Sequence, residues 1–241
     1  MRFNSLQFAR LLTLAVAAAG LAGCQSIAGI QPVSQVRVID ASPDAPALDL
    51  YQNSAAGLYS VGFGTVSSYI PVAAGTYTHA VYTAGTQQQL ASVHGSFVAG
   101  NQYTVLAGNV AANLQLTVLK DQSNPAPSGQ VALRFLDQAT RSGAVDIYLL
   151  APGSTLAGAT PTVSGVSFGR NTGYIDAPSG TYSIVVVHAG MVPTNTTALI
   201  YTGSQAYYAS GSVRTILLID QQPPTTPGLQ IISADDYDSA S

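Results

Sequence analysis

The chain contains one sequence pattern twice, and this duplication limits its fold more than any other feature. Four segments recur: VRVID (36–40) as LRFLD (133–137), LDLY (48–51) as VDIY (145–148), GTY (75–77) as GTY (180–182), and LQL (114–116) as LQI (229–231). The separation between matched segments only grows along the chain, as loop insertions in a duplicated unit produce, and one insertion falls near residues 150–161. We therefore expect both copies to adopt the same fold.

The matches divide the chain into two repeats joined by a spacer. Repeat 1 covers residues 36–122 and repeat 2 covers residues 131–237. The spacer, residues 123–130, reads SNPAPSGQ, and its prolines and small polar residues are typical of a short extended linker. Residues 238–241 form a short tail.

Within each repeat, apolar and polar residues alternate with the period of two that is typical of β-strands. In TYTHAVY (76–82), Tyr77, His79 and Val81 share one face. The chain has no Glu and a single Lys, Lys120, whereas long exposed helices depend on both residue types. These features predict an all-β protein with two tandem antiparallel β-sandwiches, Ig-like or transthyretin-like in outline, each with about seven strands.

Two tyrosines sharpen this prediction. Tyr77 and Tyr182 each follow a turn and a glycine at the start of a predicted strand, which is the spacing of the tyrosine corner of Greek-key sandwiches. In that motif the ring packs in the core and the hydroxyl bonds to a nearby backbone group. The alternative is that both are ordinary strand residues.

The first residues are typical of an export signal. Arg2 and Arg10 precede a short apolar run (11–20), too short for a membrane span, that is followed by Leu-Ala-Gly-Cys ending at Cys24. This ending resembles a bacterial lipobox, which implies that residues 1–23 are removed, that Cys24 is acylated and that residues 24–35 form a tether. Several acyl chains hold a protein firmly to a membrane. Gln25 at the next position favours the outer membrane in enteric-type sorting.

The segment VRVIDASPDAPALDLY (36–51), followed by Phe63-Gly64, Tyr69 and Gly75-Thr76-Tyr77, resembles the bacterial domain of unknown function numbered 4397. The resemblance implies a secreted or surface-anchored protein that often carries the domain in tandem, and it implies no activity. In repeat 2 the loop SPDAP (42–46) is replaced by ATRSG (139–143). A function carried by that loop would therefore be lost in repeat 2.

Acidic residues near this loop admit two interpretations. Asp40, Asp44 and Asp49 could ligate Ca²⁺ through their oxygens, but an Asp in a Ser-Pro-Asp turn more often bonds to the backbone. We also expect a partly exposed cross-strand ion pair in each repeat to fix the strand register, Arg37 with Asp49 and Arg134 with Asp146.

Motifs that would support catalysis lack their usual context. Gly165-Val166-Ser167-Phe168-Gly169 matches the nucleophile elbow of serine hydrolases, but the residues after it are poor helix formers. The three histidines lack metal-binding spacing, and Cys24 is the single cysteine. We therefore predict no catalytic, cofactor or metal site, and the net charge of −3 argues against nucleic-acid binding.

The sequence thus predicts a lipid-anchored envelope protein whose sandwiches bind or scaffold other envelope components without catalysis. One alternative is a glycan- or peptide-binding lipoprotein that uses strand tyrosines or the loop, with the candidate residues Ser42, Pro43, Asp44, Tyr51 and Tyr148. A second alternative is a hydrolase that uses Ser167.

Overall fold

The computed structural model describes residues 32–194, 196–222 and 228–237. The predicted signal peptide, Cys24, most of the predicted tether and the tail 238–241 lie outside the described residues. The residues from Val33 onward form one compact unit. Within the described ranges there is no helix with the length and hydrophobicity required to cross a bilayer.

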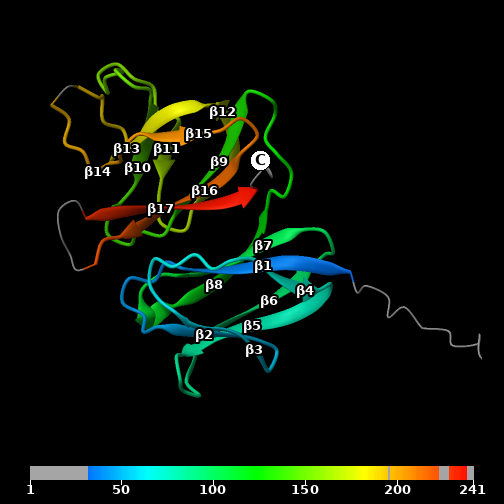
Figure 1. Cartoon of the computed structure of the whole chain (residues 1–241). Coiled ribbons are helices and arrows are strands. Elements are labelled where there is room, and N and C mark those ends of the chain that lie inside the picture. The colour runs from blue at the N-terminus through cyan, green and yellow to red at the C-terminus, as the bar shows by residue number, and fades with distance from the viewer. Residues whose placement is uncertain (1–31, 195, 223–227, 238–241) are drawn as a thin grey trace, which may run out of the picture. The chain divides into compact units, whose positions relative to one another are not determined.

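Repeat 1 folds as two four-stranded sheets (Figure 1). Its first sheet has the order β4-β1-β7-β8, with β1 (Val33–Asp40), β4 (Ile70–Ala73), β7 (Gln102–Gly108) and β8 (Gln115–Asp121). Its second sheet has the order β3-β2-β5-β6, with β2 (Leu48–Gln52), β3 (Ala55–Val61), β5 (Gly75–Thr83) and β6 (Gln89–Phe97). A single 3₁₀ turn, η1 (Ala111–Asn113), connects β7 to β8.

Repeat 2 has the same arrangement, except that two short strands take the place of β6 at one edge. Its first sheet has the order β12-β9-β16-β17, with β9 (Gln130–Asp137), β12 (Asn171–Pro178), β16 (Val213–Asp220) and β17 (Leu229–Tyr237). Its second sheet has the order β11-β10-β13-β14, with β10 (Val145–Leu150), β11 (Val163–Val166), β13 (Gly180–His188) and β14 (Tyr201–Thr202), and β15 (Ala206–Tyr208) also pairs with β13. The all-β sandwich prediction is confirmed.

One strand pair in each repeat differs from the antiparallel prediction. β1 runs parallel to β7, and β9 runs parallel to β16. The alternation of apolar residues indicates which face of a strand is buried but carries no information about strand direction. These parallel pairs join the first strand of each repeat to a strand that follows it by many residues, which makes the sheet depend on the whole repeat.

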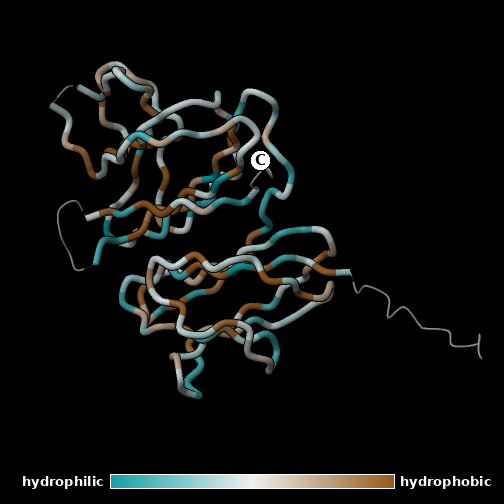
Figure 2. The backbone as a smooth tube through the Cα atoms, in the orientation of Figure 1, coloured by the Kyte–Doolittle hydropathy of each residue, from teal (hydrophilic) through white to brown (hydrophobic). Residues whose placement is uncertain are grey.

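Strand alternation builds a separate core in each repeat. In β1, Val36 and Val38 point into the core of repeat 1, whereas Arg37 and Ile39 lie on the opposite face of the sheet. Both faces of this strand are buried, and Figure 2 shows apolar stretches interspersed with polar ones along the strands of both repeats. The first sheet of each repeat is therefore covered on both sides.

The second cover is the other repeat. Ile39 and Leu106 of repeat 1 and Leu136 and Leu217 of repeat 2 are all buried in one apolar cluster. This cluster lies between the first sheets of the two repeats, so the sandwiches pack against each other through those sheets. We call it the interface cluster.

The insertion of repeat 2 covers the outer face of the second sheet. Leu156 and Ala159 pack against Tyr148 of β10 and Val185 of β13, and Tyr148 is 1% exposed.

The predicted corner tyrosines differ between the repeats. The Tyr182 hydroxyl donates to the carbonyl of Pro178 at 3.0 Å, as a tyrosine corner requires, whereas the Tyr77 ring lies over Gly75 and against Phe97.

The core of repeat 1 holds an uncharged histidine. His79 is 1% exposed and contacts Phe97 edge-on at 4.9 Å between ring centroids. Neither ring nitrogen has a hydrogen-bond partner among the described residues. Burial lowers the pKa of His79 to about 4, because the charged ring would lie in an apolar environment. The repeat equivalent is Ile184, an ordinary core residue.

We expect His79→Ile to stabilise the protein by about 1–2 kcal/mol at pH 7.5, because the substitution removes two buried polar atoms without partners. The pKa of His79 is lower in the folded than in the unfolded chain, so stability is lost as the pH falls from 6.5 towards 4. At pH 4 the wild type should have lost about 3 kcal/mol more than the variant.

Urea unfolding of both proteins between pH 7.5 and 4 measures this difference. His188→Gln is the matched control, because it removes a histidine that is exposed at the end of β13. A stability difference between His79→Ile and wild type that stays constant with pH would contradict a neutral buried imidazole.

Candidate functional site

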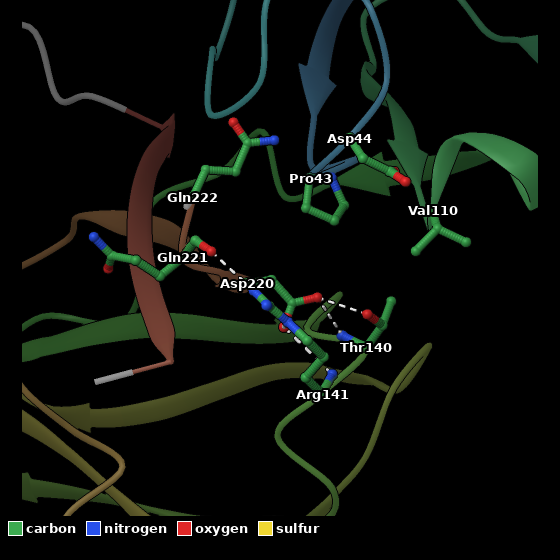
Figure 3. Close-up of a pocket in the computed structure, with 8 residues that line it drawn as sticks. All are labelled: Pro43, Asp44, Val110, Thr140, Arg141, Asp220, Gln221 and Gln222. Carbon is green, nitrogen blue, oxygen red and sulfur yellow. Dashed lines mark hydrogen bonds and ion pairs between the residues drawn. The ribbon is translucent and has the colours of Figure 1, made fainter. Parts of the chain in front are cut away.

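A pocket lies where the loops of the two repeats meet (Figure 3). It has a volume of about 230 Å³, and repeat 1 contributes Pro43 and Asp44 from the predicted SPDAP loop together with Val110. Repeat 2 contributes its replacement loop and the end of β16, namely Thr140, Arg141, Asp220, Gln221 and Gln222. We call this cavity the loop pocket. The loop that resembles the family and the loop that departs from it therefore line one site.

Different hydrogen bonds hold the two loops. In repeat 1, the Asp44 carboxylate accepts from the backbone N–H of Ala111 at 2.7 Å. In repeat 2, the buried Asp220 carboxylate accepts from the N–H and the hydroxyl of Thr140, at 2.9 and 2.7 Å, and pairs with Arg141 at 3.2 Å. The Arg141 side chain is nearly half exposed, so its guanidinium remains accessible from the pocket.

A buried carboxyl lies at the base of each loop. Asp40 accepts from the N–H of Ser42, and Asp137 accepts from the N–H of Ala139, both at 2.9 Å. Burial raises the pKa of Asp40 to about 7 and that of Asp137 to about 6, and the nearby Asp220 adds to the second shift. The folded chain therefore favours the protonated forms and loses stability as the pH rises from 3.8 towards these values.

The predicted calcium ligands do not form a site. Asp40 and Asp44 bond to separate backbone amides, and Asp49 accepts from the N–H groups of Ser60 and Gly85 at 2.8 and 2.9 Å. Among the described residues no group of three or more His, Cys, Asp or Glu is placed to hold a metal ion. The calcium interpretation is wrong because each carboxylate shapes its own turn.

The predicted tyrosine surface is also wrong for repeat 2. Tyr148 is buried beneath the insertion, so it cannot contact a ligand. Tyr51 is half-buried and contacts Tyr82 edge-on at 4.9 Å. The loop pocket thus gathers Pro43 and Asp44, while Ser42 is fully buried beneath the loop and the tyrosines lie elsewhere.

Ser167 does not sit in a nucleophile elbow. It follows β11 in a turn in which its carbonyl accepts from the N–H of Arg170 at 2.9 Å, and the next element is the strand β12. The elbow of hydrolases requires a helix at this place. The structure therefore contradicts the serine-hydrolase alternative.

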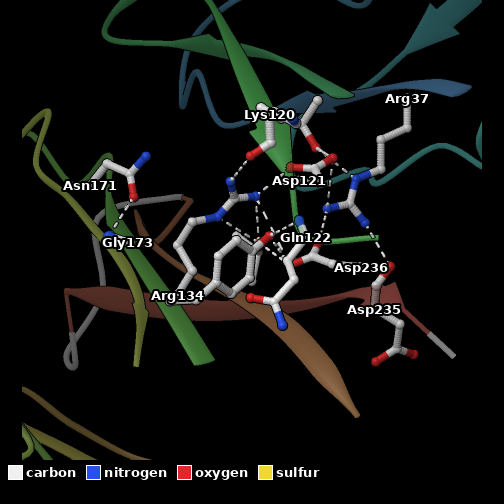
Figure 4. A network of polar contacts seen from close by, with 12 residues as sticks. Arg37, Lys120, Asp121, Gln122, Arg134, Asn171, Gly173, Asp235 and Asp236 are labelled. Atoms are coloured by element: carbon white, nitrogen blue, oxygen red, sulfur yellow. Dashed lines mark hydrogen bonds and ion pairs between the residues drawn. The ribbon is translucent and has the colours of Figure 1, made fainter. Parts of the chain in front are cut away.

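A buried network of charges holds the repeats together beside the interface cluster (Figure 4). The Arg37 guanidinium of repeat 1 forms an ion pair with Asp236 of repeat 2 and donates to the carbonyl of Asp235 at 2.9 Å. Its Nε donates to Thr104 at 2.8 Å, and its Cζ atom lies 4.7 Å from the ring centre of Tyr69. The side chain is 2% exposed.

Repeat 2 makes the same contacts in return. Arg134 forms an ion pair with Asp121 of repeat 1 at 2.6 Å and donates to the carbonyl of Lys120 at 3.2 Å. Its Nε donates to Thr215 at 2.9 Å, and its Cζ atom lies 4.7 Å from the ring centre of Tyr174. Exchanging the two repeats therefore reproduces the network.

Each aspartate is also held by its own repeat. Oδ2 of Asp121 accepts from Thr104 at 2.6 Å and from Tyr69 at 2.7 Å. Oδ2 of Asp236 accepts from Thr215 and Tyr174 at the same distances, 2.6 and 2.7 Å. The remaining oxygen of each carboxylate faces the arginine of the other repeat. Two positive and two negative groups thus balance in a site closed to water.

Burial and pairing act in opposite directions on these groups. Burial raises the pKa of Asp236, and the guanidinium groups of Arg37 and Arg134 oppose that rise. Burial would lower the pKa of Arg37, but Asp236 and Asp121 outweigh it and raise the pKa. All charges in the network depend on partners from the other repeat.

The predicted ion pairs are therefore wrong. Arg37 lies on the first sheet of repeat 1 and Asp49 lies on the second sheet, so the core separates them. The same holds for Arg134 and Asp146, which accepts from the N–H groups of Gly165 and Gly190 at 2.8 and 2.9 Å. The recurrence of Asp121 as Asp236 was visible in the sequence and was the signal for the true partners.

Comparisons with known proteins give a partial family match. A family model described as domain of unknown function (DUF4397) matches residues 34–148, which includes all of repeat 1 and ends within β10. The search of curated proteins found no match.

Solved structures show only distant likeness. One is described as α-glucan binding by a streptococcal virulence factor, with 11% identity, a TM-score of 0.27, and coverage of 76% of this chain and 92% of the other. Another is described as α-glucan recognition by family 41 carbohydrate-binding modules from streptococcal virulence factors, with 9% identity, a TM-score of 0.25, and coverage of 68% and 84%. TM-scores this low identify neither a shared fold nor a shared ligand.

The charge network predicts coupling between the repeats. We expect Arg37→Met or Asp236→Leu alone to cost about 3–5 kcal/mol, because each leaves a buried charge unpaired, and the double variant to recover much of that loss. Urea unfolding of the four proteins of this cycle gives the coupling energy.

The matched control is the cycle of Arg37→Met with Asp49→Ala. These side chains share no partner, so their effects should add within about 0.5 kcal/mol. Additive effects in the Arg37–Asp236 cycle would contradict the network.

Proposed function

We propose that this protein is a lipid-anchored component of the bacterial cell envelope and that its two sandwiches form one non-catalytic binding module. The observation that carries the proposal is the loop pocket, which both repeats build and which their packing holds in place. A pocket made from two clamped sandwiches is preorganised, so little conformational entropy is lost on binding.

The lining of the loop pocket suits a polar segment of another envelope component. Arg141 and Asp44 offer opposite charges across the cavity, and Gln221 and Gln222 offer amides that both donate and accept. Pro43 and Val110 supply an apolar contact. Such a lining favours recognition, because the carboxylates already bind the backbone and are not free to transfer protons.

The anchor is proposed from the sequence. Leu-Ala-Gly-Cys at residues 21–24 follows a short apolar run, and Gln25 favours the outer membrane. Acylation of Cys24 would provide the chains that hold the protein to a membrane. The predicted tether, residues 24–35, overlaps β1, which begins at Val33, so residues 24–32 would hold the module at the membrane surface.

Labelling with radioactive palmitate tests the anchor. We expect the wild-type protein to incorporate label and to fractionate with outer membranes, and Cys24→Ser to lose both properties because its hydroxyl replaces the acylated thiol. Cys24 is the single cysteine, so no other thiol can substitute. Label retained by Cys24→Ser would contradict the proposal.

Capture of envelope components tests the loop pocket. We expect full-length tagged protein, cross-linked in intact cells, to retain a reproducible set of components, and Arg141→Ala to reduce that set by at least about tenfold through loss of charge-assisted bonds. Lys120→Ala is the matched control, because Lys120 is an exposed cation that lines neither this pocket nor any other site proposed here. Equal capture by wild type and Arg141→Ala would contradict a role for this pocket.

A further inference from the structure

A second pocket opens between the repeats beside the interface cluster. It has a volume of about 150 Å³, and its lining includes the apolar side chains of Leu106, Leu119 and Leu136. Its walls and rim are formed by Gly108, Gln115, Thr117, Gln138, Phe168, Gly169, Arg170 and Asn171. We call it the groove pocket. It shares no lining residue with the loop pocket.

The groove pocket has an equivalent place on the other side of the interface, where each lining residue is replaced by the equivalent residue of the other repeat. The carbonyls of Asp40 and Asp137 accept from the N–H groups of Gly64 and Gly169, at 2.8 and 2.7 Å, so Phe63 and Phe168 occupy equivalent turns. On that side, Phe63, Val66 and Ile232 pack into the interface cluster. The place that is a pocket on one side is therefore filled by apolar side chains on the other.

The residues that differ explain the cavity. Five equivalent positions differ between the two sides. In each pair the first residue belongs to the filled side and the second lines the groove pocket: Ala41 and Gln138, Thr65 and Arg170, Val66 and Asn171, Ile219 and Gly108, and Ile232 and Thr117. Each change shortens an apolar side chain or replaces a small or apolar residue with a polar one. At two of these positions, Gly108 against Ile219 and Thr117 against Ile232, the side chain is shorter on the side of the groove pocket, so less apolar volume fills the contact there.

The glycine in this set serves close packing. A Cβ at Gly108 would collide with Oε1 of Gln138, so the glycine allows that amide to lie against β7.

The equivalent phenylalanines of the two repeats differ in exposure. Phe63 is packed in the interface cluster, whereas Phe168 is 41% exposed at the rim of the groove pocket. The pocket thus combines a held amide with an accessible aromatic ring.

We propose that the groove pocket binds a single acidic sugar residue of a glycan, a pyranose ring that carries a carboxylate. Hydroxyl groups both donate and accept hydrogen bonds, and so do the amides of Gln115, Gln138 and Asn171. The exposed ring of Phe168 offers an apolar face for the C–H side of a sugar. The volume lies below the range of about 300–1,000 Å³ of drug-sized pockets, which suits one ring.

The charge of the lining selects an acidic ligand. Arg170 supplies a guanidinium, and the described residues that line the groove pocket include no carboxylate to neutralise it. In the loop pocket, by contrast, Arg141 is already paired with Asp220. A ligand carboxylate would form a charge-assisted bond with Arg170. This proposal deepens the binding role of the module but does not depend on the loop pocket.

Calorimetric titration of the full-length protein in detergent tests the proposal, with tetragalacturonate as the acidic probe and maltotetraose as the neutral one. We expect saturable binding of tetragalacturonate and at least about tenfold weaker binding of maltotetraose. Arg170→Gln should weaken tetragalacturonate binding by at least about tenfold while leaving maltotetraose binding unchanged.

Thr117→Ile is the most specific variant, because it introduces the isoleucine that is present at the equivalent position, Ile232, on the filled side. It should abolish tetragalacturonate binding and leave the melting temperature unchanged or higher. Phe168→Ala tests separately whether the exposed phenylalanine ring contributes to tetragalacturonate binding. Arg141→Ala should bind tetragalacturonate as the wild type does, which separates this pocket from the partner capture proposed for the loop pocket.

Three outcomes would overturn the proposal: no binding of tetragalacturonate, wild-type binding by a folded Thr117→Ile variant, or equal affinity for the two tetrasaccharides. Tighter binding of an acetylated tripeptide with a free carboxylate than of tetragalacturonate would overturn it in favour of a peptide ligand.

Discussion

The exchange of buried charges between the repeats is the interaction on which the rest of the structure depends. A guanidinium or carboxylate that is removed from water loses several kcal/mol of hydration, which only close partners restore. Here Arg37 finds its closest carboxylate in Asp236, and Arg134 finds its own in Asp121, each on the other repeat. Separating the sandwiches would leave these charges without their closest partners and would also expose the interface cluster. The two repeats are therefore one stable unit.

The network also explains why the interface is symmetric at its centre and asymmetric at its edges. Equivalent arginine, threonine, tyrosine and aspartate residues fix the contact from both sides, so the relative position of the two first sheets is determined there. Away from this centre, individual residues diverge without loosening the contact. Thr117 in place of Ile232 leaves room for the groove pocket, Gln138 in place of Ala41 gives it a polar amide, and the divergent loops at 42–46 and 139–143 line the loop pocket.

The sequence predicted what depends on single strands and missed what depends on packing between sheets. Alternation placed Tyr77, His79 and Val81 on one face of a strand, and the all-β sandwich follows from such patterns. The partner of Arg37 depends instead on which sheet faces the other repeat, and the period of two carries no such information. Tyr148 was misjudged for a similar reason, since its strand face is covered by an insertion whose path the alternation does not reveal.

The position of the pockets at the edge of a clamped interface gives the duplication a physical consequence. Each pocket takes lining residues from both repeats, so a ligand in either pocket binds only the packed state. By mass action such a ligand stabilises the same contact that the charge network holds. A single sandwich has no second surface with which to close such a cavity. Duplication followed by divergence at the edges can thus create concave sites while the charged centre, which cannot vary without leaving a buried ion unpaired, keeps the two copies in register.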